Sequence, residues 1–569
     1  MLMFGFKNKK YIDAEEDFMA TKSHLSIEQI GAQTPKLYSR IRTTIETAFL
    51  RNNVVEVKTL AQAYELAKNA PGTIVLDQKV ANAKELELPA DANVLLFNDG
   101  NITGRQAPLR RLVDKTNVDK FASMIREVIF KSKDKKMYHA QAYIGLDKEF
   151  MVKAHLLVPE GYENTLYSWL MNFQIVNEEY TKLYNESVLL DEGDIYVYAD
   201  PDMYTEDFPK GLALFDSEHN CACLLGMRYF GEFKKGTLTL SWTIAGRNGY
   251  TACHGGQKRF NLGKGKEKVI SVFGLSGSGK STITLSDHNG KMDTTVLHDD
   301  AFIISNKDAS SICLEQSYFD KTQDYPLTNP QNKYFVTVQN CGATLDKDGK
   351  VVLVTEDIMC GNGRTIKSKF ATSNREYKFD HRCDAIFWIM KDNTLPPVLK
   401  VTDAALGSVM GATLATKRTT AEYRPGEDPN ALVIVPYANP FRLYALAEDY
   451  KKFKSLFQDM GVDCYIINTG FYVQKENGAY VEKKITPKVT LGLIEDIVND
   501  KAKFEKFGPF SALEYLPIEG LLPNFGDQEY LEMVKARLLD RLNNVKNGEG
   551  LEKLPEEALK AIEKVANEI

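Results

Sequence analysis

An eight-residue segment, Gly274-Leu-Ser-Gly-Ser-Gly-Lys-Ser281, constrains the fold of this chain more than any other feature. It fits the pattern G-x-x-x-x-G-K-[ST] and lies between an apolar run, Val269–Phe273, and a run that can form a helix, Thr282–Leu285. A glycine-rich turn between a strand and a helix directs several backbone N–H groups into one concavity, which suits phosphate oxygens. The segment therefore predicts an α/β domain with a phosphate-binding loop, although a plain glycine-rich turn is the alternative.

The same motif predicts which groups would contact a nucleotide. Lys280 would reach the β- and γ-phosphates, and the Ser281 hydroxyl would contact Mg²⁺ carried by the nucleotide. The expected phosphate-binding residues are Gly274, Leu275, Ser276, Gly277, Ser278, Gly279, Lys280, Ser281 and Thr282.

Two adjacent carboxylates, Asp299 and Asp300, follow the apolar run that begins at Thr294. We expect a strand that ends at this pair, because an acidic residue at a strand end holds Mg²⁺ in enzymes with a phosphate-binding loop. Neighbouring side chains on a strand point in opposite directions, so the pair could address two ions, or one ion and its waters. A solvated turn is the alternative interpretation.

Composition favours small anionic ligands over polymers. The chain has 569 residues, of which 43% are hydrophobic and 26% charged, and this is enough to bury two cores. The formal charge of -6 arises from 71 basic and 77 acidic residues spread along the chain, so no broad basic field is available for nucleic acid. A local pocket of a few Arg and Lys side chains would suffice for a metabolite.

Cysteine spacing and the apolar runs bear on the compartment. The eight cysteines show no paired metal-binding spacing, and we interpret them as reduced thiols. Met1–Lys10 contains no apolar signal segment, and no run reaches about eighteen unbroken apolar residues. We expect a cytoplasmic protein with no membrane partner.

Hydrophobic periodicity predicts two α/β domains, residues 1–255 and 256–569, with a boundary in the basic, glycine-rich segment Gly255–Lys268. Charged helices are expected at the C-terminal end, over Tyr530–Val545 and Leu554–Ile569. The remaining expected helices are residues 22–52, Leu60–Lys68 and Tyr162–Val176, and the expected strands are Asn93–Phe97, Tyr138–Ile144, Ile195–Tyr198, Gly211–Phe215, Cys221–Leu225, Val351–Thr355 and Ala385–Ile389.

Several short motifs recur in an order that resembles the ATP-dependent phosphoenolpyruvate carboxykinase family. Lys235 is followed nineteen positions later by His254, a separation similar to that between the family's two metal ligands. The other matching motifs are Thr103-Gly-Arg105, Tyr229 with Lys234-Lys235, the loop with Ser276, Asp299-Asp300, Asn362-Gly-Arg364, Leu395-Pro-Pro397 with Thr402, and Asn468-Thr-Gly470. The resemblance extends from about Asn93 to the end of the chain.

This resemblance implies a reaction in which oxaloacetate and ATP give phosphoenolpyruvate, ADP and CO₂, either in gluconeogenesis or in the reverse, anaplerotic direction. It implies ATP/ADP, Mg²⁺ and Mn²⁺ as cofactors, with Mn²⁺ held by Lys235, His254 and Asp300. Lys235 would have a lowered pKa, because an amine can bind a metal only when it is neutral. Mg²⁺ would lie at Ser281 and Asp299.

The resemblance also implies roles for residues that bind the substrates. Arg105 would bind a substrate carboxylate, Arg364 would lie against the carboxylate or the γ-phosphate, and Tyr229 would line the pocket for phosphoenolpyruvate or CO₂. Arg418 would contact the nucleotide. The family's two domains face each other across a cleft whose closure excludes water, and we expect that arrangement here, in a monomer.

The chain departs from the family pattern at two places and is a divergent member by this comparison. Gln106 and the residues after it replace a basic segment that follows Arg105 in the family, and Ala301-Phe302 replaces an acidic residue and a histidine after Asp300. Two other functions therefore stay open. One is a related phosphotransferase, such as an HPr kinase-like enzyme, and the other is a catalytically silent nucleotide-binding module.

Overall fold

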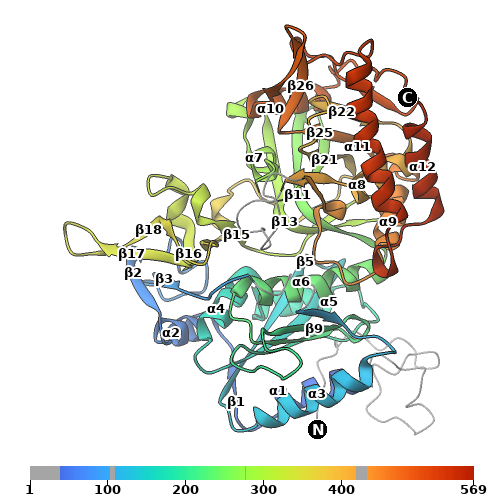
Figure 1. Cartoon of the computed structure of the whole chain (residues 1–569). Helices are drawn as coiled ribbons and strands as arrows, with labels where there is room; N and C mark the ends of the chain where they lie inside the picture. The colour runs from blue at the N-terminus through green and yellow to red at the C-terminus, as the bar shows by residue number, and fades with distance from the viewer. Residues whose placement is uncertain (1–38, 103–108, 276, 418–431) are drawn as a thin grey trace. The chain divides into compact units, whose positions relative to one another are not determined.

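The computed structural model describes residues 39–102, 109–275, 277–417 and 432–569, which form a mixed α/β structure (Figure 1). They divide into two compact units. The first comprises the described residues up to Ile244 together with Leu314–Ser373, and the second comprises Ala245–Cys313 and Asn374–Ile569. The chain therefore passes between the units more than once, which differs from the single boundary expected after residue 255.

The first unit contains a mixed sheet of eight strands. Its order is β1-β5-β6-β8-β10-β9-β4, and β7 pairs with β5. The strands are β1 (Val54–Val57), β4 (Arg110–Leu112), β5 (Met137–Asp147), β6 (Phe150–Pro159), β7 (Gln174–Ile175), β8 (Ile195–Asp200), β9 (Leu212–Asp216) and β10 (Cys221–Leu225).

A second sheet in this unit explains why Leu314–Ser373 belongs there. Its order is β15-β19-β16-β3-β2, so strands from the later segment pair with early strands, and β16 runs parallel to β3. The strands are β2 (Ile74–Lys79), β3 (Asn93–Phe97), β15 (Tyr318–Lys321), β16 (Phe335–Gln339) and β19 (Arg364–Lys367), beside a hairpin of β17 (Cys341–Leu345) and β18 (Val351–Ile358).

Six helices of the first unit pack on these sheets or beside them within the described residues. Ser39 begins the first of them by accepting hydrogen bonds from the N–H groups of Ile41 and Arg42. The helices are α1 (Arg40–Phe49), α2 (Leu60–Lys68), α3 (Val118–Lys131), α4 (Glu163–Asn172), α5 (Glu178–Glu186) and α6 (Phe230–Arg247), the last of which runs past Ile244 into the second unit.

The second unit is built on a sheet of ten strands. Its order is β20-β14-β13-β11-β12-β21-β25-β22-β29-β28. The strands are β11 (Tyr250–Gly263), β12 (Lys266–Phe273), β13 (Asp293–Ser305), β14 (Ser311–Cys313), β20 (Lys378–Phe379), β21 (Cys383–Met390), β22 (Val398–Val401), β25 (Asp463–Asn468), β28 (Glu505–Lys506) and β29 (Leu513–Tyr515), with separate hairpins β23–β24 (Ala415–Lys417 and Leu432–Ile434) and β26–β27 (Phe471–Glu476 and Ala479–Lys484).

The central strands of this sheet are buried on both faces. Ile386 and Trp388 pack in one core, whereas Ala385 and Phe387 pack in the other, as the alternation of side chains along a strand requires. The first core includes residues of α8 (Ala404–Ala412), α9 (Leu446–Gln458), α11 (Gln528–Lys546) and α12 (Glu556–Ala566), and the second includes residues of α7 (Lys280–Leu285) and α10 (Pro487–Val498). Figure 1 shows α11 and α12, which contact each other, at the C-terminal end.

Two expectations about local structure were wrong. The segment Gly255–Lys268, in which we expected the domain boundary, instead forms most of the hairpin between β11 and β12 inside the ten-stranded sheet. The strand that carries Asp299 and Asp300 does not end at them, because β13 continues to Ser305 through the buried residues Phe302–Ile304. Both carboxylates therefore lie within a strand that pairs with β11.

Two further features concern the cysteines and the helices. All eight cysteines lie in the described ranges as free thiols, and each of them except Cys360 is buried. Among the helices of the described ranges, not one combines the length and the apolar character that crossing a membrane requires.

Candidate functional site

The glycine-rich loop of the second unit connects β12 to α7, as the motif predicts. Gly279 precedes the helix with φ of +100°, a conformation that glycine adopts at little cost. Gly256 on β11 allows the helix to lie close to the sheet, because a Cβ atom at this position would be 2.0 Å from the Thr284 hydroxyl. Ser278 is buried, and its Oγ has no hydrogen-bond partner among the described residues.

Lys280, the first residue of α7, forms an ion pair with Asp299 on β13. Its Nζ lies 2.6 Å from Asp299 Oδ1, and the two side chains are 11% and 3% exposed. Burial strengthens such a pair because less water screens the charges. The lysine of the motif is therefore held beside the first carboxylate of the acidic pair.

His254 on β11 lies next to the second carboxylate. Its Nε2 is 2.9 Å from Asp300 Oδ1, and its Nδ1 is 2.5 Å from the carbonyl oxygen of Ala438. Because a carbonyl oxygen only accepts hydrogen bonds, Nδ1 carries a proton and donates it. Phe441 packs edge-on against the imidazole ring at 5.5 Å. These contacts fix the ring with Nε2 toward Asp300.

This pair fits one divalent cation. Ligands about 2.1 Å from a metal, at right angles to each other, lie about 3 Å apart, which matches the separation of His254 Nε2 and Asp300 Oδ1. A second residue that fixes the other ring nitrogen is typical of metal-binding histidines, and the Ala438 carbonyl has this role here. Over the residues that the structure describes, no group of three His, Cys, Asp or Glu side chains is arranged to hold a metal ion.

The first unit holds a different set of the expected residues. Arg364 begins β19, and its Nε donates a hydrogen bond to the Tyr229 hydroxyl at 3.2 Å. Arg364 is 7% exposed, and its Nη1 is buried without a hydrogen-bond partner among the described residues. A buried guanidinium nitrogen without a partner is costly, so this atom is a strong candidate to bind an anion.

Asp99, which the sequence analysis did not identify, links the segments that carry Tyr229 and Arg364 through hydrogen bonds. Its carboxylate accepts hydrogen bonds from the backbone N–H of Phe230 at 2.7 Å and from Asn340 Nδ2 at 2.6 Å. Phe230 begins α6 directly after Tyr229, and Asn340 also bonds to Asn362, two residues before Arg364. Burial raises the pKa of Asp99 to about 7, although the Phe230 and Asn340 hydrogen bonds and the charge of Arg364 act in the opposite direction.

The two lysines of α6 differ in their surroundings. Lys234 is fully buried, and its Nζ lies 3.0 Å from Glu315 Oε1, which also accepts a hydrogen bond from Asn172 Nδ2. The Nζ of Lys235 lies 5.8 Å from the centre of the Trp242 ring, in cation–π geometry. Of the two, Lys234 is thus committed to a buried ion pair within its own unit.

Apart from Lys235, which lies near Trp242 in the first unit, the expected residues fall into three groups. The second unit brings together the glycine-rich loop, Asp299, Asp300 and His254, and the first unit brings Tyr229 next to Arg364. Arg364 was expected in the C-terminal domain, but its strand belongs to the first unit. Arg105, Ser276 and Arg418 lie outside the described residues.

Comparisons with a family model and with curated proteins point to the same family. A family model described as phosphoenolpyruvate carboxykinase matches residues 66–515. Three similar curated proteins are the phosphoenolpyruvate carboxykinase (ATP) of Aeropyrum pernix, 24% identical over 318 residues (53% of this chain and 62% of that protein), that of Dictyostelium discoideum, 22% over 235 residues (38% and 40%), and the glycosomal one of Trypanosoma brucei brucei, 23% over 303 residues (50% and 59%).

The chain thus spans between 40% and 62% of the length of these relatives. The family model, in contrast, covers most of the chain, from α2 to β29, including both the acidic pair and the Tyr229–Arg364 pair. The chain belongs to the ATP-dependent phosphoenolpyruvate carboxykinase family.

Proposed function

We propose that this chain converts oxaloacetate and ATP to phosphoenolpyruvate, ADP and CO₂, reversibly. The observation that carries the proposal is that two adjacent carboxylates contact different side chains: Asp299 pairs with Lys280, and Asp300 lies beside His254. One carboxylate thus adjoins the expected phosphate-binding lysine and the next adjoins an expected ligand of Mn²⁺. Family membership and the names of the relatives support the choice of ATP and phosphoenolpyruvate.

For the nucleotide, we propose that backbone N–H groups of residues 274–282 bind the phosphates, other than the Ser278 N–H, which donates to the Leu275 carbonyl oxygen. Lys280 would exchange its contact with Asp299 for the β- and γ-phosphate oxygens, which carry more negative charge. Asp299 and the Ser281 hydroxyl would then be available to hold Mg²⁺ on the nucleotide. Arg418 stays a candidate contact to the same nucleotide.

For the carboxylate substrate, we propose that Arg364 and Arg105 bind its anionic groups. The buried, unpartnered Nη1 of Arg364 supports this role, because a carboxylate oxygen would satisfy it. Tyr229 orients the guanidinium by accepting a hydrogen bond from its Nε. The substrate would thus be oriented by charge-assisted hydrogen bonds before its carbon–carbon bond breaks.

We further propose that His254, Asp300 and Lys235 hold the transition metal. The chemistry that Mn²⁺ supplies when bound is positive charge beside the oxygen that becomes negative as CO₂ leaves. His254 would contribute through Nε2, since Nδ1 is engaged by Ala438. Lys235 would contribute as a neutral amine. The γ-phosphoryl group then passes to the enolate oxygen without a protein nucleophile.

An assay of phosphoenolpyruvate formation from oxaloacetate, MgATP and MnCl₂ tests the proposal with Lys280→Met and His254→Asn variants. The parent should form product, and each variant should lose at least about 100-fold in turnover, as expected when one preorganised charge is removed. Tight MgATP binding by a parent that forms no phosphoenolpyruvate would reject the substrate assignment. A related phosphotransferase or a silent nucleotide binder would then be the better description.

A further inference from the structure

Two loops follow the strands next to β12, at the edge of the sheet where the glycine-rich loop begins. β21 pairs with β12 in parallel, and β25 pairs with β21 in parallel, so the carboxyl ends of all three strands lie at one edge. Lys391 is the first residue after β21, and Thr469 is the first after β25. In open α/β sheets, ligands bind beyond the carboxyl ends of parallel strands.

Both residues hold carbonyl groups of the glycine-rich loop. Thr469 Oγ1 donates a hydrogen bond to the Ser278 carbonyl oxygen at 2.7 Å, and Lys391 Nζ donates one to the Gly277 carbonyl oxygen at 3.0 Å. These carbonyls belong to consecutive peptide groups. The orientation of two peptide planes in the loop is therefore set by residues outside it.

The orientation matters because a trans peptide is planar, with its C=O and N–H pointing in opposite directions. When Thr469 holds the Ser278 carbonyl, the Gly279 N–H of the same peptide is directed away from Thr469. When Lys391 holds the Gly277 carbonyl, the Ser278 N–H of the same peptide points away from Lys391. It donates a hydrogen bond to the Leu275 carbonyl oxygen at 3.0 Å. Gly277 permits this turn, with φ of +76°.

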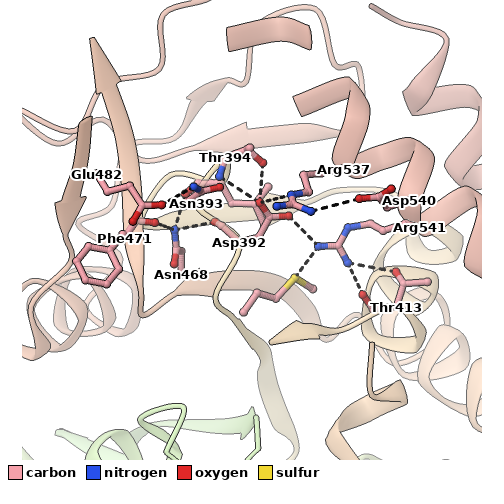
Figure 2. A network of polar contacts seen from close by, with 12 residues as sticks. Asp392, Asn393, Thr394, Thr413, Asn468, Phe471, Glu482, Arg537, Asp540 and Arg541 are labelled. Atoms are coloured by element: carbon pink, nitrogen blue, oxygen red, sulfur yellow. Dashed lines mark hydrogen bonds and ion pairs between the residues drawn. The ribbon is translucent and has the colours of Figure 1, made fainter. Parts of the chain in front are cut away.

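A buried polar network fixes the two loops that carry Lys391 and Thr469 (Figure 2). The amide of Asn468 donates hydrogen bonds to the carbonyl oxygens of Asp392, Leu395 and Phe471, at 3.0, 2.8 and 2.8 Å. The loop after β25 is thereby bound to the loop after β21.

The same network reaches α11, the α-helix that precedes the last α-helix of the chain. The Asp392 carboxylate accepts hydrogen bonds from the backbone and hydroxyl of Thr394 and lies 3.3 Å from Arg541 Nη2 on α11. Asp392 and Arg541 are both almost fully buried. Because this network anchors the two loops that carry Lys391 and Thr469, these residues cannot easily move together with the glycine-rich loop.

We propose that Thr469 and Lys391 are positioning residues for the phosphate-binding loop, which they act on through the Ser278 and Gly277 carbonyls. This inference rests on the proposed binding of a nucleotide by the loop, but not on the identity of the second substrate. By holding these carbonyls, the two residues fix two consecutive peptide planes of the loop, including the one whose Gly279 N–H points away from Thr469, so that the loop needs less reorganisation when phosphate binds.

The test compares Thr469→Val, which keeps the shape but removes the hydroxyl, with Thr469→Ser, which keeps the hydroxyl. Calorimetry would measure binding of MgATP and of inorganic tripolyphosphate to the full chain, beside the melting temperature of each variant. We expect Thr469→Val to weaken binding of both ligands up to about tenfold, the value of one hydrogen bond, and Thr469→Ser to stay within about twofold. Lys391→Met should weaken binding similarly.

Parent-like binding by Thr469→Val, or equal losses in Thr469→Val and Thr469→Ser, would overturn the proposal, because the hydroxyl would then have no part in binding. A parent that binds neither ligand would overturn it as well. Selective weakening in Thr469→Val and Lys391→Met supports it even if the parent forms no phosphoenolpyruvate. In that case only the proposed reaction fails.

Discussion

Asp300 and His254 lie on neighbouring antiparallel strands, with a carboxylate oxygen 2.9 Å from an imidazole nitrogen. Because the other imidazole nitrogen donates to Ala438, this nitrogen is the one that can bind a metal. We predict that His254→Asn weakens Mn²⁺ binding at least about tenfold, since the variant lacks the ligand that we propose for the metal. Electron paramagnetic resonance of free Mn²⁺ in a titration measures this directly.

His381→Ala is the matched control, because His381 is partly exposed in the same unit and bonds to Asp384 instead. It should bind Mn²⁺ as the parent does. Equal affinity of the parent and the His254→Asn variant would remove His254 from the metal site.

Lys280 provides the second prediction. Its replacement by Met removes the ammonium group that would leave Asp299 for the phosphates, and it leaves the Asp299 carboxylate without this partner. We expect MgATP affinity and turnover to fall together, turnover by at least about 100-fold. Lys268→Met on β12 is the control, since Lys268 is half-exposed and lies 3.9 Å from Asp500. A Lys280→Met variant as active as this control would contradict the proposed role.

Asp99 provides a prediction about pH. Burial raises its folded-state pKa to about 7 from 3.8, so the folded protein keeps a proton that the unfolded chain releases. Its contribution to stability is therefore complete below pH 3.8 and is lost as the pH rises through about 7. We predict that the melting temperature of the parent falls between about pH 5 and about pH 8.5 more steeply than that of Asp99→Asn.

The Asp99→Asn variant should also be less stable at acidic pH. Asn340 Oδ1 already accepts hydrogen bonds from the N–H groups of residues 99 and 100, so its amide must still donate toward position 99. An asparagine there would set two donors against each other, at a cost of about 1–3 kcal/mol. Asp134→Asn, at an exposed site, is the control. Identical pH slopes for parent and Asp99→Asn would refute the buried-proton explanation.

The ion pair of Arg541 and Asp392 predicts a stability effect. Removing one partner of a buried pair leaves the other charge uncompensated, so Arg541→Met should lower the free energy of unfolding by about 3–5 kcal/mol. Adding Asp392→Asn should recover part of the loss, because no unpaired charge then remains. Urea denaturation of both variants tests this. Additive losses in the double variant would show that the two side chains do not interact.

Local signals in the sequence predicted part of this structure accurately. The helix Leu60–Lys68 and the strands Asn93–Phe97 and Cys221–Leu225 are confirmed with their expected bounds. The glycine-rich loop follows its strand and precedes its helix, since both the apolar run and the glycines are local features. The acidic pair Asp299-Asp300 was also identified from a local feature, the apolar run that precedes it.

Contacts between distant segments could not be predicted in this way. The pairing of β16 with β3 brings Arg364 into the first unit, and nothing in the residues near Arg364 specifies a partner more than two hundred positions earlier. The same limit applies to Asp99 and Asn340. Thr469 was noticed only within the motif Asn468-Thr-Gly470, and its contact with Ser278 depends on the order of strands in the sheet.

The most direct test of the proposed function is the product balance of the purified chain with oxaloacetate, MgATP and Mn²⁺. Our account predicts that phosphoenolpyruvate, ADP and CO₂ form in equal amounts, because the γ-phosphoryl group passes to the enolate that decarboxylation leaves. Formation of ADP and inorganic phosphate without phosphoenolpyruvate would contradict the account.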